Sequence, residues 1–125
     1  MPIHGAMRTF TYDGRAFKVA HDGSGNKVIG GRNNEVAMNG DGSFRGIQTV
    51  MPGSFSDIGI EIDDSRGDQE FLQDHANAGL PKPAVATYAS NISYTGDLVI
   101  TGEIQKDENT GLVSLSLQGG ELQKI

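Results

Sequence analysis

The residue types that most often carry chemistry are few in this chain and lie far apart. The three histidines, His4, His21 and His75, have no spacing that would let two of them hold one metal ion, and the chain contains no cysteine. The sequence therefore excludes the Cys/His and HExxH patterns of zinc sites, and it excludes disulfides. We expect no metal site and no cofactor.

Several acidic or glycine-rich segments match ligand-binding motifs only in part. Residues 22–26 read DGSGN, which lacks the alternating oxygen ligands of a calcium loop and the βαβ context of a dinucleotide site. Asp63 and Asp64, like Asp107 and Glu108, are sequence neighbours, whereas acid–base catalysis needs carboxylates that converge in a pocket. No nucleophile has a recognisable base partner, so we predict that the protein is not an enzyme.

Composition and charge indicate one small β domain. The chain has 125 residues, of which 18 are glycine, and this glycine content favours many turns and bulges. A net charge of −6 argues against a nucleic-acid-binding surface. Residues 1–50 hold six basic and four acidic residues, and residues 51–125 hold four and twelve. This asymmetry fits either a solvated acidic face or head-to-tail attraction between copies.

No run approaches the roughly 20 apolar residues of a membrane span, so we expect no membrane insertion. The N-terminus also has no apolar run of the kind found in signal peptides. These observations predict a soluble protein that is made in a cytoplasm.

The clearest local signal is a β-hairpin near the N-terminus. Phe10 and Tyr12 alternate with threonines, and residues 15–19 resume the alternation after Asp13 and Gly14. Asp and Gly tolerate the positive φ angles of a two-residue type I′ turn. This segment therefore predicts two antiparallel strands.

Further strands and one helix follow from the remaining periodicity. Alternation predicts strands at 58–63, 98–104 and 113–117, with shorter candidates at 27–29, 35–38, 84–89 and 91–95. The pattern from Ser65 to Asp68 resembles a capping box, and Gly79 precedes two prolines, so we predict a helix at about 66–78. The expected fold is a single domain over residues 1–125, mainly β, as a β-sandwich or small barrel with one flanking α-helix.

Residues 39–54 are predicted to form a long loop with an apolar interior. Long loops in small domains usually have a function, and exposed apolar clusters usually mark interfaces. The segment either contacts another subunit, in ring stacking or between neighbours, or folds back over its own core. The residues proposed for the contact are Phe44, Arg45, Ile47, Val50 and Met51. Residues 1–7 are a further candidate, as an arm that becomes ordered on stacking.

The order of these segments resembles the tail tube proteins of contractile-tailed bacteriophages, particularly the Mu-type family. The likeness spans most of the chain: the 10–19 hairpin, the glycine-rich loop, Pro52, the 58–63 strand, the helix near Phe71 and Leu72, and the pair 98–104 and 111–119. Its most suggestive part is the closing pattern, which is an acidic strand, a turn, an alternating strand and then Gly119 and Gly120.

This resemblance implies a virion protein made in the host bacterial cytoplasm. Its copies would form six-fold rings that stack into the inner tail tube and conduct the genome into the host. The implied partners are other copies of the chain, the tail sheath and baseplate proteins, and DNA in transient, non-specific passage. Tube proteins of secretion systems and of phage-derived bacteriocins are similar in architecture, so these alternatives stay open.

A polar, net negative lumen would keep DNA from adhering during passage. The residues proposed to line the lumen are the polar ones that alternate with apolar residues along the predicted strands. Each of them could instead face ordinary solvent outside a tube. They are Glu61, Asp63, Glu103, Ser114, Ser116 and Gln118. A different class of function is a monomeric β-sandwich that binds a carbohydrate or peptide, but that function favours an aromatic platform, and the chain has no Trp, three Tyr and five Phe.

Overall fold

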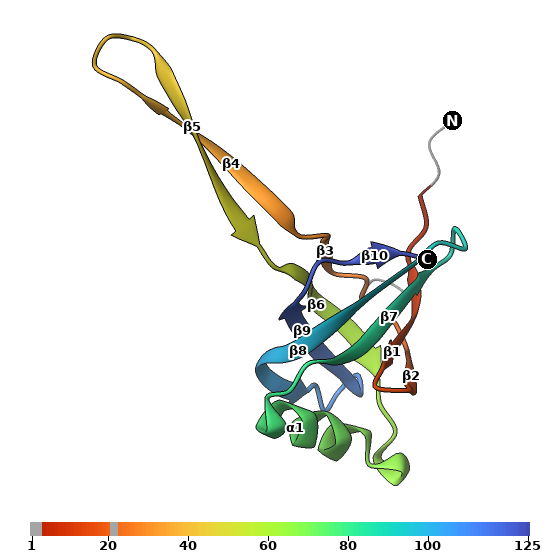
Figure 1. The fold of residues 1–125 in the computed structure, drawn as a ribbon. Coiled ribbons are helices and arrows are strands. Elements are labelled where there is room, and N and C mark those ends of the chain that lie inside the picture. The colour runs from red at the N-terminus through yellow and green to blue at the C-terminus, as the bar shows by residue number, and fades with distance from the viewer. Residues whose placement is uncertain (1–3, 21–22) are drawn as a thin grey trace.

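The computed structural model describes residues 4–20 and 23–125, and strands dominate it (Figure 1). The strands are β1 (Met7–Tyr12), β2 (Arg15–Lys18), β3 (Asn26–Val28), β4 (Gly31–Met38), β5 (Phe44–Met51), β6 (Gly53–Glu61), β7 (Lys82–Tyr88), β8 (Ser93–Lys106), β9 (Leu112–Gly119) and β10 (Gln123–Lys124). A short 3₁₀ helix, η1 (Asp64–Arg66), leads into the helix α1 (Asp68–Ala78). The mainly β fold with one helix is confirmed.

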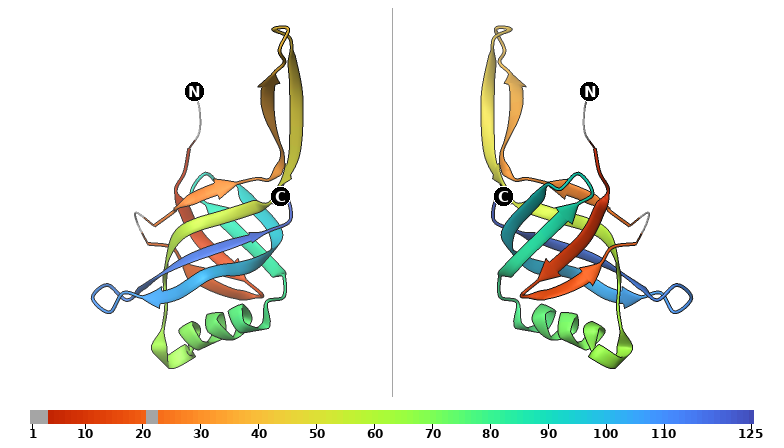
Figure 2. Two further views of the ribbon diagram at one scale, coloured as in Figure 1. Left: turned by 90° about the vertical axis from the view of Figure 1, so that its left-hand side faces the viewer. Right: turned by 90° about the vertical axis from the view of Figure 1, so that its right-hand side faces the viewer.

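The main sheet curves round into a small barrel (Figure 2). Its strand order is β2-β1-β7-β8-β9-β6-β3, and β10 adds to β8. The chain directly after β2 lies against β6. There Val19 forms a β-bridge with Ile60, and the Ala20 N–H donates to the Gly59 carbonyl oxygen at 2.9 Å. This contact joins the two sides of the sheet and encloses one core.

The core consists of the inward-facing residues of nearly every barrel strand. The predicted apolar phases of the strands are confirmed, because their side chains point away from water and exclude it from the barrel interior. Among the described residues, the buried apolar side chains are Met7, Phe10, Tyr12, Phe17, Phe55, Ile58, Ile60, Leu72, Ala84, Ala86, Leu98, Ile100, Val113, Leu115, Leu117 and Leu122.

The predicted N-terminal hairpin is present as β1 and β2. Asp13 and Gly14 form its turn with φ values of 49° and 84°, as a type I′ turn requires. At the end of β1, the buried Tyr12 hydroxyl donates to the Leu98 carbonyl oxygen at 3.0 Å. The hairpin is thereby tied to β8 as well as to β7.

Helix α1 covers one end of the barrel (Figures 1 and 2). Leu72 is fully buried there, and the Phe71 ring lies 6.3 Å from the Phe17 ring. The Nε2 atom of His75 lies 2.8 Å from a carboxylate oxygen of Asp13, in the turn between β1 and β2. No helix within residues 4–20 and 23–125 has the length and apolar character needed to cross a membrane.

The start of this helix differs from the sequence prediction. The predicted range of about 66–78 is close, since α1 spans Asp68–Ala78, but the capping box from Ser65 to Asp68 is wrong. Asp63 instead caps η1, where its carboxylate accepts from the Ser65 N–H at 2.8 Å. The residue before α1 is Gly67, which supplies no side-chain cap.

Asp68 has a structural role that the capping box did not anticipate. Its side chain is 1% exposed, and its two oxygens accept from the Arg15 guanidinium at 3.1 Å and from the Asp63 N–H at 2.9 Å. The Arg15 guanidinium also lies 4.2 Å from the centre of the Phe71 ring. One buried carboxylate therefore connects the start of α1 to β2 and to the segment between β6 and η1.

The predicted loop over residues 39–54 is wrong. Only residues 39–43 connect strands, residues 44–51 form β5, and β6 begins at Gly53. β4 and β5 pair along their whole length as a separate two-stranded sheet, and this hairpin projects from the barrel (Figures 1 and 2). The strand signal was missed because both faces of β5 are open to solvent, so its sequence has no apolar and polar alternation.

Two glycines set the direction in which the hairpin leaves the barrel. Gly30 and Gly31 have φ values of 97° and 104°, a conformation that side chains disfavour. A Cβ atom at Gly30 would also lie 2.8 Å from the Gly53 nitrogen. On the return path, Pro52 connects β5 to β6, and its ring restricts its own φ angle. We call Gly30, Gly31 and Pro52 the joint between the hairpin and the barrel, and its geometry depends on these specific residues.

Candidate interaction surfaces

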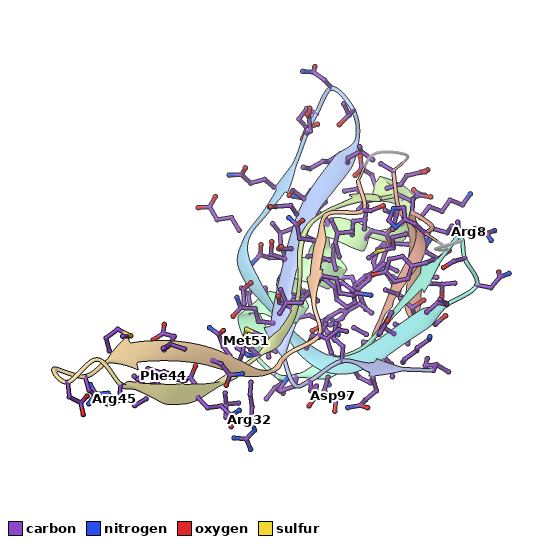
Figure 3. All side chains as sticks on the ribbon, turned by 90° about the horizontal axis from the view of Figure 1, so that it is seen from above. Arg8, Arg32, Phe44, Arg45, Met51 and Asp97 are labelled. Carbon is purple, nitrogen blue, oxygen red and sulfur yellow. The ribbon has the colours of Figure 1, made fainter. Side chains whose placement is uncertain are left out.

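The projecting hairpin, residues 31–51, presents two different faces. Residues that are directly opposite in an antiparallel pair share a face. Met38 lies opposite Phe44, and Val36 lies opposite Gly46, so one face is apolar toward the tip. The other face mixes charge and apolar groups, and includes Arg45 and Ile47. Figure 3 shows the hairpin from above, extending sideways beyond the outline of the barrel.

The hairpin side chains are open to solvent to an unusual degree. Val50 is 80% exposed, Phe44 70% and Met38 68%. Large apolar side chains normally stay out of water, since each buried one contributes about 1.5–3 kcal/mol. Clusters of exposed apolar side chains are typical of surfaces that contact another molecule.

All five sequence-predicted contact residues lie on β5, but they do not share one face. Phe44 and Val50 lie on the face that carries Met38, whereas Arg45, Ile47 and Met51 lie on the opposite face. The alternative in which the segment folds back over its own core is wrong, because β5 has no buried residue.

A chain of polar side chains holds the two strands in register. The Arg32 guanidinium donates to the Gln48 amide oxygen at 3.2 Å, and the Gln48 amide nitrogen donates to Asn34 at 3.1 Å. A slip of one residue would break these bonds and move every side chain to the other face. The hairpin therefore displays a defined surface.

The tip, residues 39–43, is ordered by its own hydrogen bonds. The Asn39 N–H donates to the Ser43 carbonyl oxygen at 2.8 Å, and the Ser43 hydroxyl donates to the Asp41 carboxylate at 2.6 Å. The Ser43 N–H donates to the same carboxylate oxygen at 3.0 Å. These bonds stabilise the charged form and hold the pKa of Asp41 below its usual value. The tip thus presents a fixed, ionised carboxylate.

The outer face of β6, β9 and β8 collects most of the residues predicted to line a lumen. Ser114, Ser116 and Gln118 point outward along β9, opposite Gly59 on β6 and Thr101 and Val99 on β8. Glu61 lies at the end of β6 and is exposed. This surface is polar and has small side chains over much of its area.

Of the other two predicted lumen residues, Asp63 lies off this face, and Glu103 lies beside it, in contact with the Gln105 that pairs with Ser114. Asp63 follows β6 and caps η1, and hydrogen bonds from Ser65 hold the pKa of Asp63 below its usual value. Glu103 lies in an irregular stretch of β8 next to Gly102, where the pairing with β9 shifts register. Its carboxylate accepts from the Gln105 amide at 2.7 Å.

A pocket of about 510 Å³ lies at the barrel end opposite α1, and sequence reasoning missed it. We call this the mouth pocket. Lys27 of β3, Tyr88 of β7 and Tyr94 of β8 meet there with Ser24 and Ser90. Long-range strand pairing brings these side chains together, so no local sequence motif could have indicated them.

The centre of the mouth pocket is a lysine held between two tyrosines. The Lys27 ammonium lies 3.4 Å from the centre of the Tyr94 ring and 4.9 Å from that of Tyr88, within the range of cation–π attraction. The Tyr88 hydroxyl oxygen is buried and has no hydrogen-bond partner among the described residues. Burial raises the pKa of Tyr88 to about 12, so this hydroxyl stays protonated.

Of the remaining candidates, residues 4–6 of the predicted N-terminal arm, including His4, line the mouth pocket, and His75 lies on α1. His21, Asp22 and residues 1–3 of the predicted N-terminal arm are outside the described residues. Within residues 4–20 and 23–125, no three His, Cys, Asp or Glu side chains are placed to hold a metal ion. No family model, curated protein or solved structure matches the chain.

Proposed function

We propose that this chain is a structural subunit that assembles with copies of itself into stacked rings, as the inner tube of a contractile phage tail. The observation that carries the proposal is the projecting hairpin. An isolated two-stranded hairpin is at best marginally stable in water, yet this one has defined pairing over all eight residues of each strand. Contact with another chain would cover its apolar side chains and its open edges.

The barrel supports the same proposal. Its core is complete within one chain, so the subunit folds first and associates afterwards. Its outer β6-β9-β8 face is polar and carries few charges, which suits a wall along which DNA moves without binding. Sheath and baseplate proteins would then contact the tube from outside and at its end.

The test compares the native chain with a variant that lacks the hairpin. Residues 32–50 are replaced by Asn-Gly, which joins the paired residues Gly31 and Met51 through a two-residue turn. Removing only residues 42–50 would be a poorer variant, since it would leave β4 without its partner strand.

Sedimentation velocity and negative-stain electron microscopy over a wide concentration range provide the readout. We expect rings or tubes of uniform diameter from the native chain, and a folded monomer with unchanged thermal unfolding from the variant. A native chain that stays monomeric at every concentration would contradict the proposal. Rings formed equally well by the variant would remove the hairpin from the assembly contact.

The lumen assignment has its own test in assembled tubes. The Glu61→Lys and Glu103→Lys changes together should make the tubes retain short duplex DNA at low salt, because the polar wall becomes basic. A matched pair of charge reversals near α1, Asp74→Lys and Glu70→Lys, should not. Equal retention by both pairs would place Glu61 and Glu103 outside the lumen.

Other tubes, of a secretion system or a phage-derived bacteriocin, fit the same surfaces. The binding module, a function of another class, is favoured by one observation, the mouth pocket with its two tyrosines. A monomer at all concentrations that binds a small ligand at this pocket would support the module. The Lys27→Ala variant would then lose the ligand and keep its fold.

A further inference from the structure

We propose that the mouth pocket is the receptor for the hairpin tip of a neighbouring copy, with Lys27 of one subunit paired to Asp41 of the next. This inference rests on the proposed function, because it requires that copies of the chain associate. It adds which two sites touch, the mouth pocket and the hairpin tip, and it places the two copies side by side.

The mouth pocket has the chemistry of a receptor for an acidic and apolar segment. Among residues 4–20 and 23–125, no carboxylate lies within ion-pairing distance of the Lys27 ammonium, which rests on the rings of Tyr88 and Tyr94. The Lys27 ammonium can donate hydrogen bonds to an incoming acceptor. A carboxylate would pair with this ammonium, and the tyrosine rings would cover apolar side chains beside it.

The hairpin tip has the complementary chemistry. The Asp41 carboxylate accepts two hydrogen bonds from Ser43, which hold it in place and favour its charged form. Phe44 and Met38 are paired next to it on one face and are largely exposed. Aromatic pairs and sulfur–aromatic contacts with tyrosines would bury these side chains. The tip therefore offers one anion flanked by two apolar groups.

The direction of the hairpin makes the contact intermolecular. The hairpin leaves the barrel at the end where β3 and β10 lie and leads outward from it (Figures 1 and 3). β3 also supplies Lys27 to the mouth pocket, so the hairpin and the pocket belong to the same end of the barrel. Eight strand residues at about 3.3 Å each form an arm of roughly 26 Å. That arm reaches over most of a neighbouring domain of this size, whose radius of gyration is about 13 Å. A contact that joins different surfaces at the same end of side-by-side copies can close into a ring.

Charge exchange tests the pairing directly. We expect Lys27→Glu and Asp41→Lys each to weaken association by roughly tenfold or more in sedimentation, and the double variant to recover most of the loss. Thermal unfolding of each variant provides the folding control. Lys18→Glu is the matched control, because it reverses an exposed charge on β2 outside the pocket.

Engineered cysteines report the contact without changing either charge, and the chain has no native cysteine to interfere. Gly40→Cys lies at the tip, where a Cβ meets no atom within 4 Å, and Ser90→Cys lines the mouth pocket. A mixture of the two single variants should form a disulfide-linked heterodimer. The doubly substituted chain should give a ladder that ends at a closed ring.

A third cysteine separates the outcomes. Leu80→Cys lies after α1, at the opposite end, and is 57% exposed. If Gly40→Cys links to Leu80→Cys and not to Ser90→Cys, copies stack end to end through the hairpin, which overturns the mouth pocket and leaves the proposed tube intact. Rings that form without either crosslink would also overturn the mouth pocket as the receptor and leave the proposed tube intact. A monomer without crosslinks overturns both proposals.

Discussion

β9 and β5 are both eight residues long, and they bury their side chains in opposite ways. On β9, the inward residues Val113, Leu115 and Leu117 are almost inaccessible, because β6 and β8 pair on both sides and the core lies beneath. On β5, no residue is buried, and only β4 pairs with it. The barrel draws its stability from its own buried side chains, whereas the hairpin leaves its large apolar side chains open to solvent.

The largest effect is expected from a cavity in the barrel. Leu117→Ala should lower the free energy of unfolding by about 3 kcal/mol, since a large buried side chain is removed from a close-packed core. Urea unfolding monitored by circular dichroism measures the change. A loss below about 1 kcal/mol would mean that Leu117 is loosely packed, and the contrast in burial between the barrel and the hairpin would then be smaller than described.

A smaller loss is expected where α1 joins the barrel. Asp68→Asn keeps the size of the side chain but removes the charge that holds Arg15 and the Asp63 N–H. We expect a loss of about 2 kcal/mol, as for hydrogen bonds to a charged group. Arg15→Gln, measured in the same way, should give a comparable loss, and the two changes together should cost less than their sum because they remove the same contact.

Polar substitutions on the hairpin should leave the free energy of unfolding nearly unchanged. Phe44→Ser and Val50→Ser remove exposed side chains, so the expected change is within about 0.5 kcal/mol. The same variants should abolish ring formation in electron microscopy. A loss of stability as large as that of Leu117→Ala would show that these side chains pack within their own chain.

The smallest effects concern two aspartates that accept hydrogen bonds from neighbouring serines, one in each region. Asp41 at the hairpin tip and Asp63 at η1 both have lowered pKa values. Because a lowered folded-state pKa favours the charged form, their contributions to stability are present above the usual aspartate pKa. These contributions are lost as the pH falls through the lowered value. Carboxyl NMR titration should show both groups titrating below the usual aspartate pKa, and Ser43→Ala should return Asp41 alone toward its usual range.

The contrast between the two regions also explains what the sequence could predict. Phe10, Tyr12 and the inward residues of β6, β8 and β9 alternate because one face is buried, and this alternation predicts all or part of each strand. β6 is predicted only from residue 58, and the continuous β8 is predicted as two segments, 91–95 and 98–104. β5 has no such alternation, so its residues were recognised as apolar and exposed but were assigned to a loop. The closure of the barrel at Gly59 and the meeting of Lys27 with Tyr94 depend on contacts between distant strands, which local patterns do not contain.

The outward-facing residues were predicted less completely than the core. Ser114, Ser116 and Gln118 followed correctly from the polar phase of β9. Glu103 is exposed as predicted, but it lies in a stretch of irregular pairing near Gly102 that the alternation of β8 does not indicate. Asp63 is not part of the sheet face, because the strand ends before it and its carboxylate caps η1 instead.

The glycine joint at Gly30 and Gly31 bears on the size of an assembly built through the hairpin. In a closed ring, the angle between one barrel and its neighbour is set by the angle at which the hairpin leaves its own barrel. Every copy repeats that angle, so a small rotation at the joint accumulates around the circle and changes how many subunits complete it. The inner diameter of such a tube would then depend on the φ angles of two adjacent residues that do not themselves line it.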